Sequence, residues 1–165
     1  MKLNKPFIIV LFLFSVLWTV VGASEYKLEI ALVYKVSKFV YWPEKSLSEQ
    51  ASFGVCILGN THKGKAFFIL QKRKIKSLPI KIYNLNYSDE IDSQCQVVVI
   101  DPSRNVYLDI ILKEIIKKPL LTLSSMEGFA KKGGMIEFLV KTKPIKFAIN
   151  LDKLKSSGID VILHY

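Results

Sequence analysis

The apolar residues of the chain fall into short strand-like runs that alternate with helical stretches. Four runs are continuously apolar or alternate with a period of two, which is typical of strands: residues 52–59, 79–85, 95–101 and 120–125. Helical spacing is found between them, over residues 62–72 and 104–118. Strands that alternate with helices predict a parallel sheet, because each parallel connection needs a crossover.

In two long helical stretches, the spacing of the apolar residues predicts which side of the helix is buried. For the helix predicted over residues 104–118, Ser103 is the expected N-terminal cap. The side chains expected to be buried along it are Val106, Ile110, Ile111, Ile115 and Ile116. An earlier stretch, residues 25–42, ends at Pro43, because the residue before a proline is disfavoured in a helix. Its predicted stripe is Leu28, Ala31, Leu32, Val36, Phe39 and Val40.

The pattern changes near the C-terminus. Residues 135–140 and 145–151 alternate and are joined by about five residues, which predicts a hairpin. A short helix is expected over residues 151–157, with Asn150 or Asp152 near its cap, and a strand or short helix after Gly158. The predicted fold class is α/β: a three-layer, mostly parallel sheet flanked by helices, with a C-terminal antiparallel hairpin.

The N-terminus has the features of a secretory signal. Lys2 and Lys5 precede an uncharged run over residues 6–23, which ends in the short side chains of Val21, Gly22 and Ala23. We predict a signal peptide over residues 1–23, cleaved after Ala23, and a single domain over residues 24–165. The alternative is an uncleaved anchor, because the run is about long enough to cross a bilayer.

The basic charge narrows the class of partner. The formal charge is +10, and removal of Lys2 and Lys5 with the signal would leave +8. An exported basic protein meets anionic lipid, cell-wall polymer or an acidic partner more readily than nucleic acid. Only residues 72–76 form a basic run, and it lacks the interleaved aromatic residues of a nucleic-acid stacking surface. The alternative, which we prefer, is an ordinary solvated surface, because the lysines are spread along the chain.

The two cysteines, Cys56 and Cys95, predict a disulfide only if the chain is exported to an oxidising compartment. In an oxidising compartment a single pair favours a disulfide, and free buried thiols are the alternative. The sequence offers little for catalysis: His62 and His164 are far apart, and no four-ligand zinc set or G-x-S-x-G elbow occurs. We therefore expect no catalytic residues, no metal and no cofactor.

The segment GNTHKGKA, residues 59–66, is one residue short of the phosphate-loop pattern G-x-x-x-x-G-K-[ST]. Ala66 replaces the hydroxyl that would hold Mg²⁺, and an exported chain leaves the nucleoside triphosphate pool. We interpret the segment as a strand-to-helix turn and predict a modest anion site at Asn60, Lys63 and Lys65. A small-molecule site at the carboxyl ends of the strands, near Gly59, Asn60, Asp101, Ser124 and Ser125, is the related alternative.

Six segments in a fixed order resemble the YfiR-like family of exported bacterial proteins. They are KFVYWPE, VCILGN, CQVVVID, LLTLSS, GFAKKGGMIEFLV and IKFAINLDKLKSSGIDV, and they span the chain from about Glu25 to its end. Trp42-Pro43 and the stretch from Gly133-Gly134 to Ile149-Asn150 carry most of the resemblance.

The resemblance implies a periplasmic, non-enzymatic protein with a compact α/β fold. Such a protein represses a membrane-bound diguanylate cyclase by binding its periplasmic part, so that cyclic-di-GMP signalling and biofilm formation follow the state of the envelope. Cys56 and Cys95 stand where the family places cysteines, which strengthens the disulfide interpretation, but the further pair some members carry near the hairpin is absent. A homodimer is an assembly to consider. Relatives often continue with a further apolar stretch, whereas this sequence ends at Tyr165. We therefore do not expect a dimer contact made by such a stretch.

Overall fold

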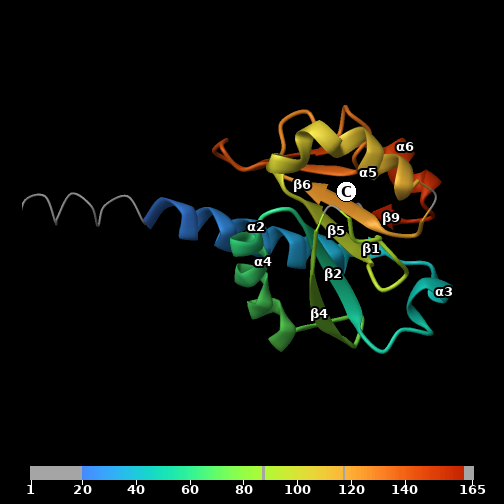
Figure 1. The fold of residues 1–165 in the computed structure, drawn as a ribbon. Coiled ribbons are helices and arrows are strands. Elements are labelled where there is room, and N and C mark those ends of the chain that lie inside the picture. Colours follow the sequence, from blue (N-terminus) through green and yellow to red (C-terminus); the bar gives the residue numbers. More distant parts are fainter. Residues whose placement is uncertain (1–19, 87, 117, 162–165) are drawn as a thin grey trace, which may run out of the picture.

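A mixed sheet forms the centre of the computed structural model, which describes residues 20–86, 88–116 and 118–161 (Figure 1). Its strands are β2 Phe53–Leu58, β3 Lys74–Ile75, β4 Leu78–Leu85, β5 Val97–Ile100, β6 Leu121–Ser124, β7 Ile136–Leu139 and β8 Lys146–Ile149. They lie in the order β3-β4-β2-β5-β6-β7-β8. The five strands from β4 to β7 in this order run parallel, while β3 and β8 are antiparallel to their neighbours at the two edges. The predicted mostly parallel sheet and its C-terminal hairpin, β7–β8, are confirmed.

Helices cover both faces of this sheet and give the predicted three layers. One face packs against α2 (Val20–Phe39), α4 (Thr61–Phe67) and the 3-10 helix η1 (Phe68–Lys72). The other face packs against α5 (Leu108–Glu114), which the 3-10 helix η2 (Pro102–Tyr107) precedes. Figure 1 shows α2 and α4 side by side and α5 on the far side of the strands. The central strands β2, β5 and β6 are buried at every position, since side chains on both faces point into a core.

A second, two-stranded sheet ties the end of α2 to the end of the described chain. It pairs β1 (Val40–Tyr41) with β9 (Asp160–Val161), and α3 (Glu44–Leu47) and α6 (Leu151–Ser156) lie next to these strands in the sequence. Trp42 follows β1 and is buried edge-on against Phe53, with ring centroids 5.2 Å apart. Its indole N–H donates to the carbonyl of Ser37 at 3.2 Å. The segment after Gly158, left open between strand and helix, is a strand.

The prediction for residues 104–118 is wrong in its cap and in part of its stripe. The helix begins at Pro102 as a 3-10 helix, and the carboxylate of Asp101, not Ser103, is the cap: its Oδ1 accepts from the Ser103 N–H at 3.0 Å. Three residues per turn in η2 shift the rotation of the following α-helix. The residues that face the core are Leu108, Ile111 and Ile115, while Val106, Ile110 and Ile116 are exposed.

The stripe predicted for residues 25–42 is confirmed only in part. Val40 is buried and Leu32 and Val36 pack against the core, but Phe39 is 59% exposed. Ile30, Val33 and Ser37, which the predicted stripe leaves out, are buried. The buried face includes polar residues that a search for apolar spacing passes over. Ser37, for example, is accommodated because its hydroxyl donates to the carbonyl of Val33 at 2.7 Å. Residues 62–72, predicted as one helix, form α4 followed by η1.

The predicted signal segment, residues 1–23, lies largely outside the described residues. Helix α2 begins at Val20 and continues through the predicted cleavage point after Ala23. Within the part of the chain that is described, no helix has both the length and the apolar character needed to cross a bilayer. Cleavage after Ala23, and the alternative of a retained anchor, remain predictions.

Candidate functional site

The segment over residues 59–66 is a strand-to-helix turn whose two glycines have packing roles. Gly59 follows β2 with a φ of 140°, and a Cβ there would collide with the side chain of Asp101. Gly64 lies in α4 against β4, where a Cβ would collide with the side chain of Asn84. Gly59 requires glycine because of its positive φ and the close approach of Asp101, whereas at Gly64 a Cβ would force the Asn84 side chain to move. The glycines therefore serve close packing of helix on sheet.

Asn60 caps the helix that follows this turn. Its Oδ1 accepts from the N–H groups of His62, at 2.8 Å, and Lys63, at 3.4 Å. An asparagine at this position is favoured because its side chain satisfies N–H groups that have no partner within the helix. The acceptor of Asn60 is thus engaged by its own helix, while the side chain as a whole stays exposed.

Lys63 is directed into the protein. Only 1% of its side chain is exposed, and its Nζ lies 2.8 Å from Glu29 Oε1 and 3.3 Å from Asp101 Oδ2. Glu29 comes from α2 and Asp101 from the carboxyl end of β5, so one ammonium joins the N-terminal helix, α4 and the sheet. A buried lysine requires such partners, because an unpaired charge in the interior is costly.

Asp101 is held in its ionised form. Burial raises the pKa of its carboxyl group, but hydrogen bonds from Ser103 and the nearby Lys63 ammonium outweigh this, so that the pKa lies below its ordinary value. The carboxylate therefore acts as a permanent anion at neutral pH, serving Lys63 through Oδ2 and the start of η2 through Oδ1. Its predicted place at the end of a central strand is correct.

The three residues predicted to hold an anion are not gathered at one surface point. Lys63 turns inward, whereas Asn60 and Lys65 are exposed. Arg104, which the sequence analysis did not consider, reaches this turn and donates from Nη2 to the carbonyl of Gly59 at 3.4 Å. Anion binding at Asn60 and Lys65 stays a prediction, and the ammonium of Lys63 already has two carboxylate partners.

Glu29 is the partner that sequence reasoning missed. It lies next to Ile30 in a helix whose other buried positions are apolar or small, and its side chain is almost inaccessible. The available signal was a single carboxylate on the buried face of a long helix, which requires a cation opposite it. That signal could indicate a partner but could not name Lys63, which is 34 positions away in the sequence.

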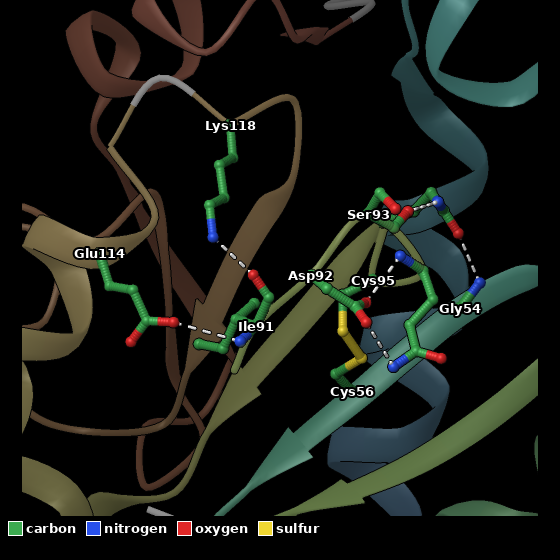
Figure 2. Close-up of a disulfide and its surroundings, with 10 residues drawn as sticks. Gly54, Cys56, Ile91, Asp92, Ser93, Cys95, Glu114 and Lys118 are labelled. Atoms are coloured by element: carbon green, nitrogen blue, oxygen red, sulfur yellow. Dashed lines mark hydrogen bonds between the residues drawn. A yellow bond between two sulfur atoms is a disulfide. The ribbon is translucent and has the colours of Figure 1, made fainter. Parts of the chain in front are cut away.

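The predicted pair Cys56 and Cys95 forms a disulfide in the structure. Cys56 lies in β2 and Cys95 just before β5, with Cα atoms 5.7 Å apart, and both residues are buried (Figure 2). The bond joins two neighbouring parallel strands at the point where a long loop returns to the sheet. Among the described residues there is no free cysteine.

Hydrogen bonds hold the loop that enters the disulfide on both sides (Figure 2). On the side of β2, Gln96 accepts from the Gly54 N–H at 2.6 Å through its Oε1. On the side of α5, the Ile91 N–H donates to Glu114 Oε1 at 3.2 Å, and Lys118 Nζ donates to the Ile91 carbonyl at 2.6 Å. Within the loop, Asp92 Oδ1 accepts from the Gln94 N–H at 2.9 Å.

A hollow of about 600 Å³ lies at the carboxyl ends of β5, β6 and β7. Of the residues predicted to form a ligand site there, only Ser125 lines it. Ser124 is buried, and its hydroxyl both donates to the Ile100 carbonyl at 2.7 Å and accepts from the Met126 N–H at 3.0 Å. Gly59, Asn60 and Asp101 lie elsewhere, around the ion pair of Lys63.

The GFAKKGGMIE segment is organised by a buried carboxylate. Glu137, in β7, accepts from the N–H groups of Gly128, at 2.9 Å, and Ala130, at 3.3 Å. Asn150 donates from Nδ2 to the Ala130 carbonyl at 2.9 Å and caps α6 through Oδ1. These contacts explain why a glutamate stands within an otherwise apolar strand and why Asn150 precedes a helix.

No metal centre can be assembled from the residues described. Within residues 20–86, 88–116 and 118–161, no group of three or more histidine, cysteine, aspartate or glutamate side chains could hold an ion. His62 is exposed at the start of α4, and His164 lies outside the described residues.

The search of curated proteins gives no match to this chain. The sequence profile of the YfiR/HmsC-like family, by contrast, matches residues 26–162, which include the whole of the mixed sheet and the helices on both of its faces except the first turns of α2. The match also includes the ion pair of Lys63, the Cys56–Cys95 disulfide and the loop held by Glu137. The chain therefore belongs to the YfiR/HmsC-like family.

Proposed function

We propose that this protein is a periplasmic regulatory binding protein. It binds the periplasmic part of an inner-membrane signalling protein, such as a diguanylate cyclase, and represses it. The family match over residues 26–162 is the observation that carries the proposal, because the family is regulatory and non-catalytic. The Cys56–Cys95 disulfide supports it, since structural disulfides persist in oxidising compartments such as the periplasm. Cleavage after Ala23 is part of the proposal, and intact mass of the exported protein checks it.

The exposed edge strand β8 is the surface we assign to the partner. In the described sheet β8 pairs with β7 on one side only, so alternate backbone N–H and C=O groups point outward. Phe147 and Ile149 of β8 and the adjacent Leu151 are 43%, 39% and 46% exposed. An open edge with apolar side chains suits a partner that adds an extended segment to the sheet.

Positive charge around this edge fits an acidic partner segment. Lys141, Lys143 and Lys146 lie in or beside the hairpin and are all exposed. No salt bridge is found for them in the described part of the chain, where the ion pairs are those of Lys63. Lysines at an open edge also discourage indiscriminate pairing with other strands, which favours a selected partner.

The test combines capture with cellular signalling. The tagged mature protein should recover an inner-membrane protein that carries a periplasmic domain and a cyclase domain, and deletion of the gene should raise cellular cyclic-di-GMP. Ile149→Lys should weaken both capture and repression, because it places a charge on the apolar edge. The matched control is Ile69→Lys in η1. It makes the same change at another exposed isoleucine, which lies away from β8.

Two outcomes count against the proposal. Recovery of no inner-membrane signalling protein from envelope extracts would contradict the proposed partner. Equal capture by the Ile149→Lys and Ile69→Lys proteins would exclude β8 as the surface. The alternative is that β8 pairs with β8 of a second copy to form a homodimer. Analytical ultracentrifugation tests this: if the wild type is a dimer and Ile149→Lys dissociates it, the edge binds a second copy and not the signalling protein.

A further inference from the structure

A separate hollow of about 240 Å³ lies between α5 and α6, at the amino-terminal ends of β6 and β7. Figure 1 shows α5 and α6 next to each other on the side of the molecule away from α2 and α4. The hollow is distinct from the open edge of β8 and from the ion pair of Lys63. Its walls are of two chemical kinds.

The inner wall is apolar. Leu112 of α5, Ile115 just after α5 and Met135 just before β7 form it, and the more exposed Ile116 stands at its rim. Such a wall favours the body of an apolar ligand, because covering it removes apolar surface from water.

The rim is positively charged. Lys113, Lys132 and Lys153 line the hollow, and Asp109 is the one carboxylate among the residues that line it. Within the described part of the chain, Lys113 and Lys153 have no ion pair, and Lys132 donates to Asn105 Oδ1 at 2.7 Å. Several ammonium groups against one carboxylate give the rim a field that attracts anions.

The hydroxyl groups of the wall are already committed to the backbone. Ser156 and Ser157 donate to the carbonyls of Lys153, at 2.9 Å, and Leu154, at 2.7 Å. Thr122 Oγ1 accepts from the Met135 N–H at 2.9 Å, and this residue is only 1% exposed, so its own O–H is not open to a ligand. The ammonium groups are therefore the strong donors that remain for a ligand, and they select a negative charge rather than a neutral polar group.

Apolar wall and charged rim meet at Gly133. This residue has a φ of 102°, and a Cβ built on it would lie 3.6 Å from Leu112 Cδ1 and 3.8 Å from Lys153 Cε. An apolar side chain of α5 and the stem of a lysine of α6 thus approach the same point. A ligand seated there would contact both kinds of surface at once.

We propose that this hollow binds a small monocarboxylate with a compact apolar body. The carboxylate lies at Lys113 and Lys153, and the apolar body covers Leu112, Ile115 and Met135. The hollow is below the roughly 300–1,000 Å³ of sites for drug-sized ligands, which restricts the ligand to a small one. This goes beyond the regulatory function proposed above: it gives the protein a small-molecule site that shares no residue with its partner surface, and it does not depend on that partner.

The experiment uses the mature protein with octanoate as the probe. Calorimetry should show saturable binding at one site, and the methyl signals of Leu112, Ile115 and Ile116 should shift in NMR spectra. Octylammonium, which has the same apolar chain and the opposite charge, should not bind there, and acetate and inorganic phosphate should bind far more weakly. The paired change Lys113→Gln and Lys153→Gln should weaken octanoate binding by at least about tenfold, as expected for loss of a charge-assisted hydrogen bond.

The control is Lys45→Gln, an exposed lysine of α3 away from the hollow, which should leave octanoate binding unchanged. Circular dichroism of each variant confirms that it is folded before its affinity is compared. Absence of saturable octanoate binding at millimolar concentration would overturn the proposal. So would equal binding of octylammonium or of inorganic phosphate, or unchanged affinity in the double lysine variant.

Discussion

Lys63 Nζ lies 2.8 Å from Glu29 Oε1, and the two side chains are only 1% and 3% exposed. Asp101 completes the group at 3.3 Å from the same nitrogen. The ion pair joins α2 to the start of α4 and to the end of β5, which are distant in the sequence. Since one ammonium lies between two carboxylates, its loss would leave two like charges buried together.

The first prediction concerns the stability of this group. Lys63→Met, which keeps most of the side-chain volume, should lower the free energy of unfolding by about 3–5 kcal/mol, because it breaks a buried ion pair from one side. Urea unfolding followed by circular dichroism measures the change. Lys65→Met, two positions along α4 and exposed, should change stability by less than about 0.5 kcal/mol. Equal effects of the two substitutions would contradict the buried role of Lys63.

The second prediction concerns the pH dependence that Asp101 contributes. Its pKa is lower in the folded than in the unfolded protein, so at acid pH the unfolded chain binds more protons. The stabilisation is complete above the ordinary pKa of 3.8 and is lost as pH falls through the lower folded value. Asp101→Asn keeps an acceptor for the Ser103 N–H and removes the charge.

Urea unfolding between pH 7 and pH 2 tests this contribution. The Asp101→Asn protein should be less stable than the wild type at neutral pH, and the difference should shrink as the pH falls. Asp109→Asn, at an exposed position of α5, is the matched control. A difference between wild type and Asp101→Asn that stays constant over the whole range would show that the carboxylate is not held ionised by folding.

The third prediction concerns the Cys56–Cys95 disulfide. It closes a loop with a sequence separation of 39, for which the chain-entropy model gives about 4 kcal/mol of stabilisation. The double change Cys56→Ala and Cys95→Ala should lose about this amount, and a reductant should destabilise the wild type but leave the double variant unchanged. If reductant lowers the stability of both proteins equally, its effect does not pass through this bond.

The sequence predicts the layers of this fold well because its signals are local. The apolar run of β5 reports its own burial. The alternating runs locate β7 and β8 but not their burial, since β7 is buried at three of its four positions and β8 is mostly exposed. The sequence predicts less well which side of each helix faces the core. Val106 and Ile110 match a helical stripe but lie exposed, because a 3-10 turn sets the rotation of α5. The short strands β1 and β3 have two residues each, too few to give a period.

The candidate site was predictable only in part, for a different reason. Asp101 could be placed at the end of a strand, and the Cys56–Cys95 pair followed from export. The inward direction of Lys63 could not be foreseen, because lysines near a helix start are usually solvated. It depends on Glu29, whose approach requires α2 to pack beside α4. Contacts between elements distant in the sequence leave no periodic signal.

The fourth prediction tests the anion site expected at the start of α4. With Lys63 engaged by Glu29 and Asp101, anion binding there depends on Asn60 and Lys65. Thermal shift with inorganic phosphate or sulfate should show concentration-dependent stabilisation that Lys65→Gln reduces. Lys76→Gln, an exposed lysine between β3 and β4, is the control for non-specific charge effects. Flat responses to both anions, or equal losses in the two variants, would remove the site.

The last prediction concerns Glu137 and the loop that it holds. Its carboxylate accepts from the Gly128 N–H through Oε1 and from the Ala130 N–H through Oε2, so that each oxygen serves one amide. Glu137→Gln replaces one oxygen with a donor and leaves a buried N–H unpaired, which should cost about 1–3 kcal/mol of unfolding free energy. The amides of Gly128 and Ala130 should also exchange with solvent faster.

Glu127→Gln makes the same chemical change at an exposed position of the same loop. It should change neither the unfolding free energy nor the exchange of these amides. Hydrogen exchange followed by NMR separates the local effect from the global one, because loosening confined to the loop speeds these two amides more than those of β5 and β6. The same loop carries Lys132 and Gly133, which line the hollow between α5 and α6. Because Glu137 holds the loop in place, the Glu137→Gln protein should also bind octanoate more weakly. Unchanged exchange at Gly128 and Ala130 would show that the carboxylate of Glu137 does not hold the loop.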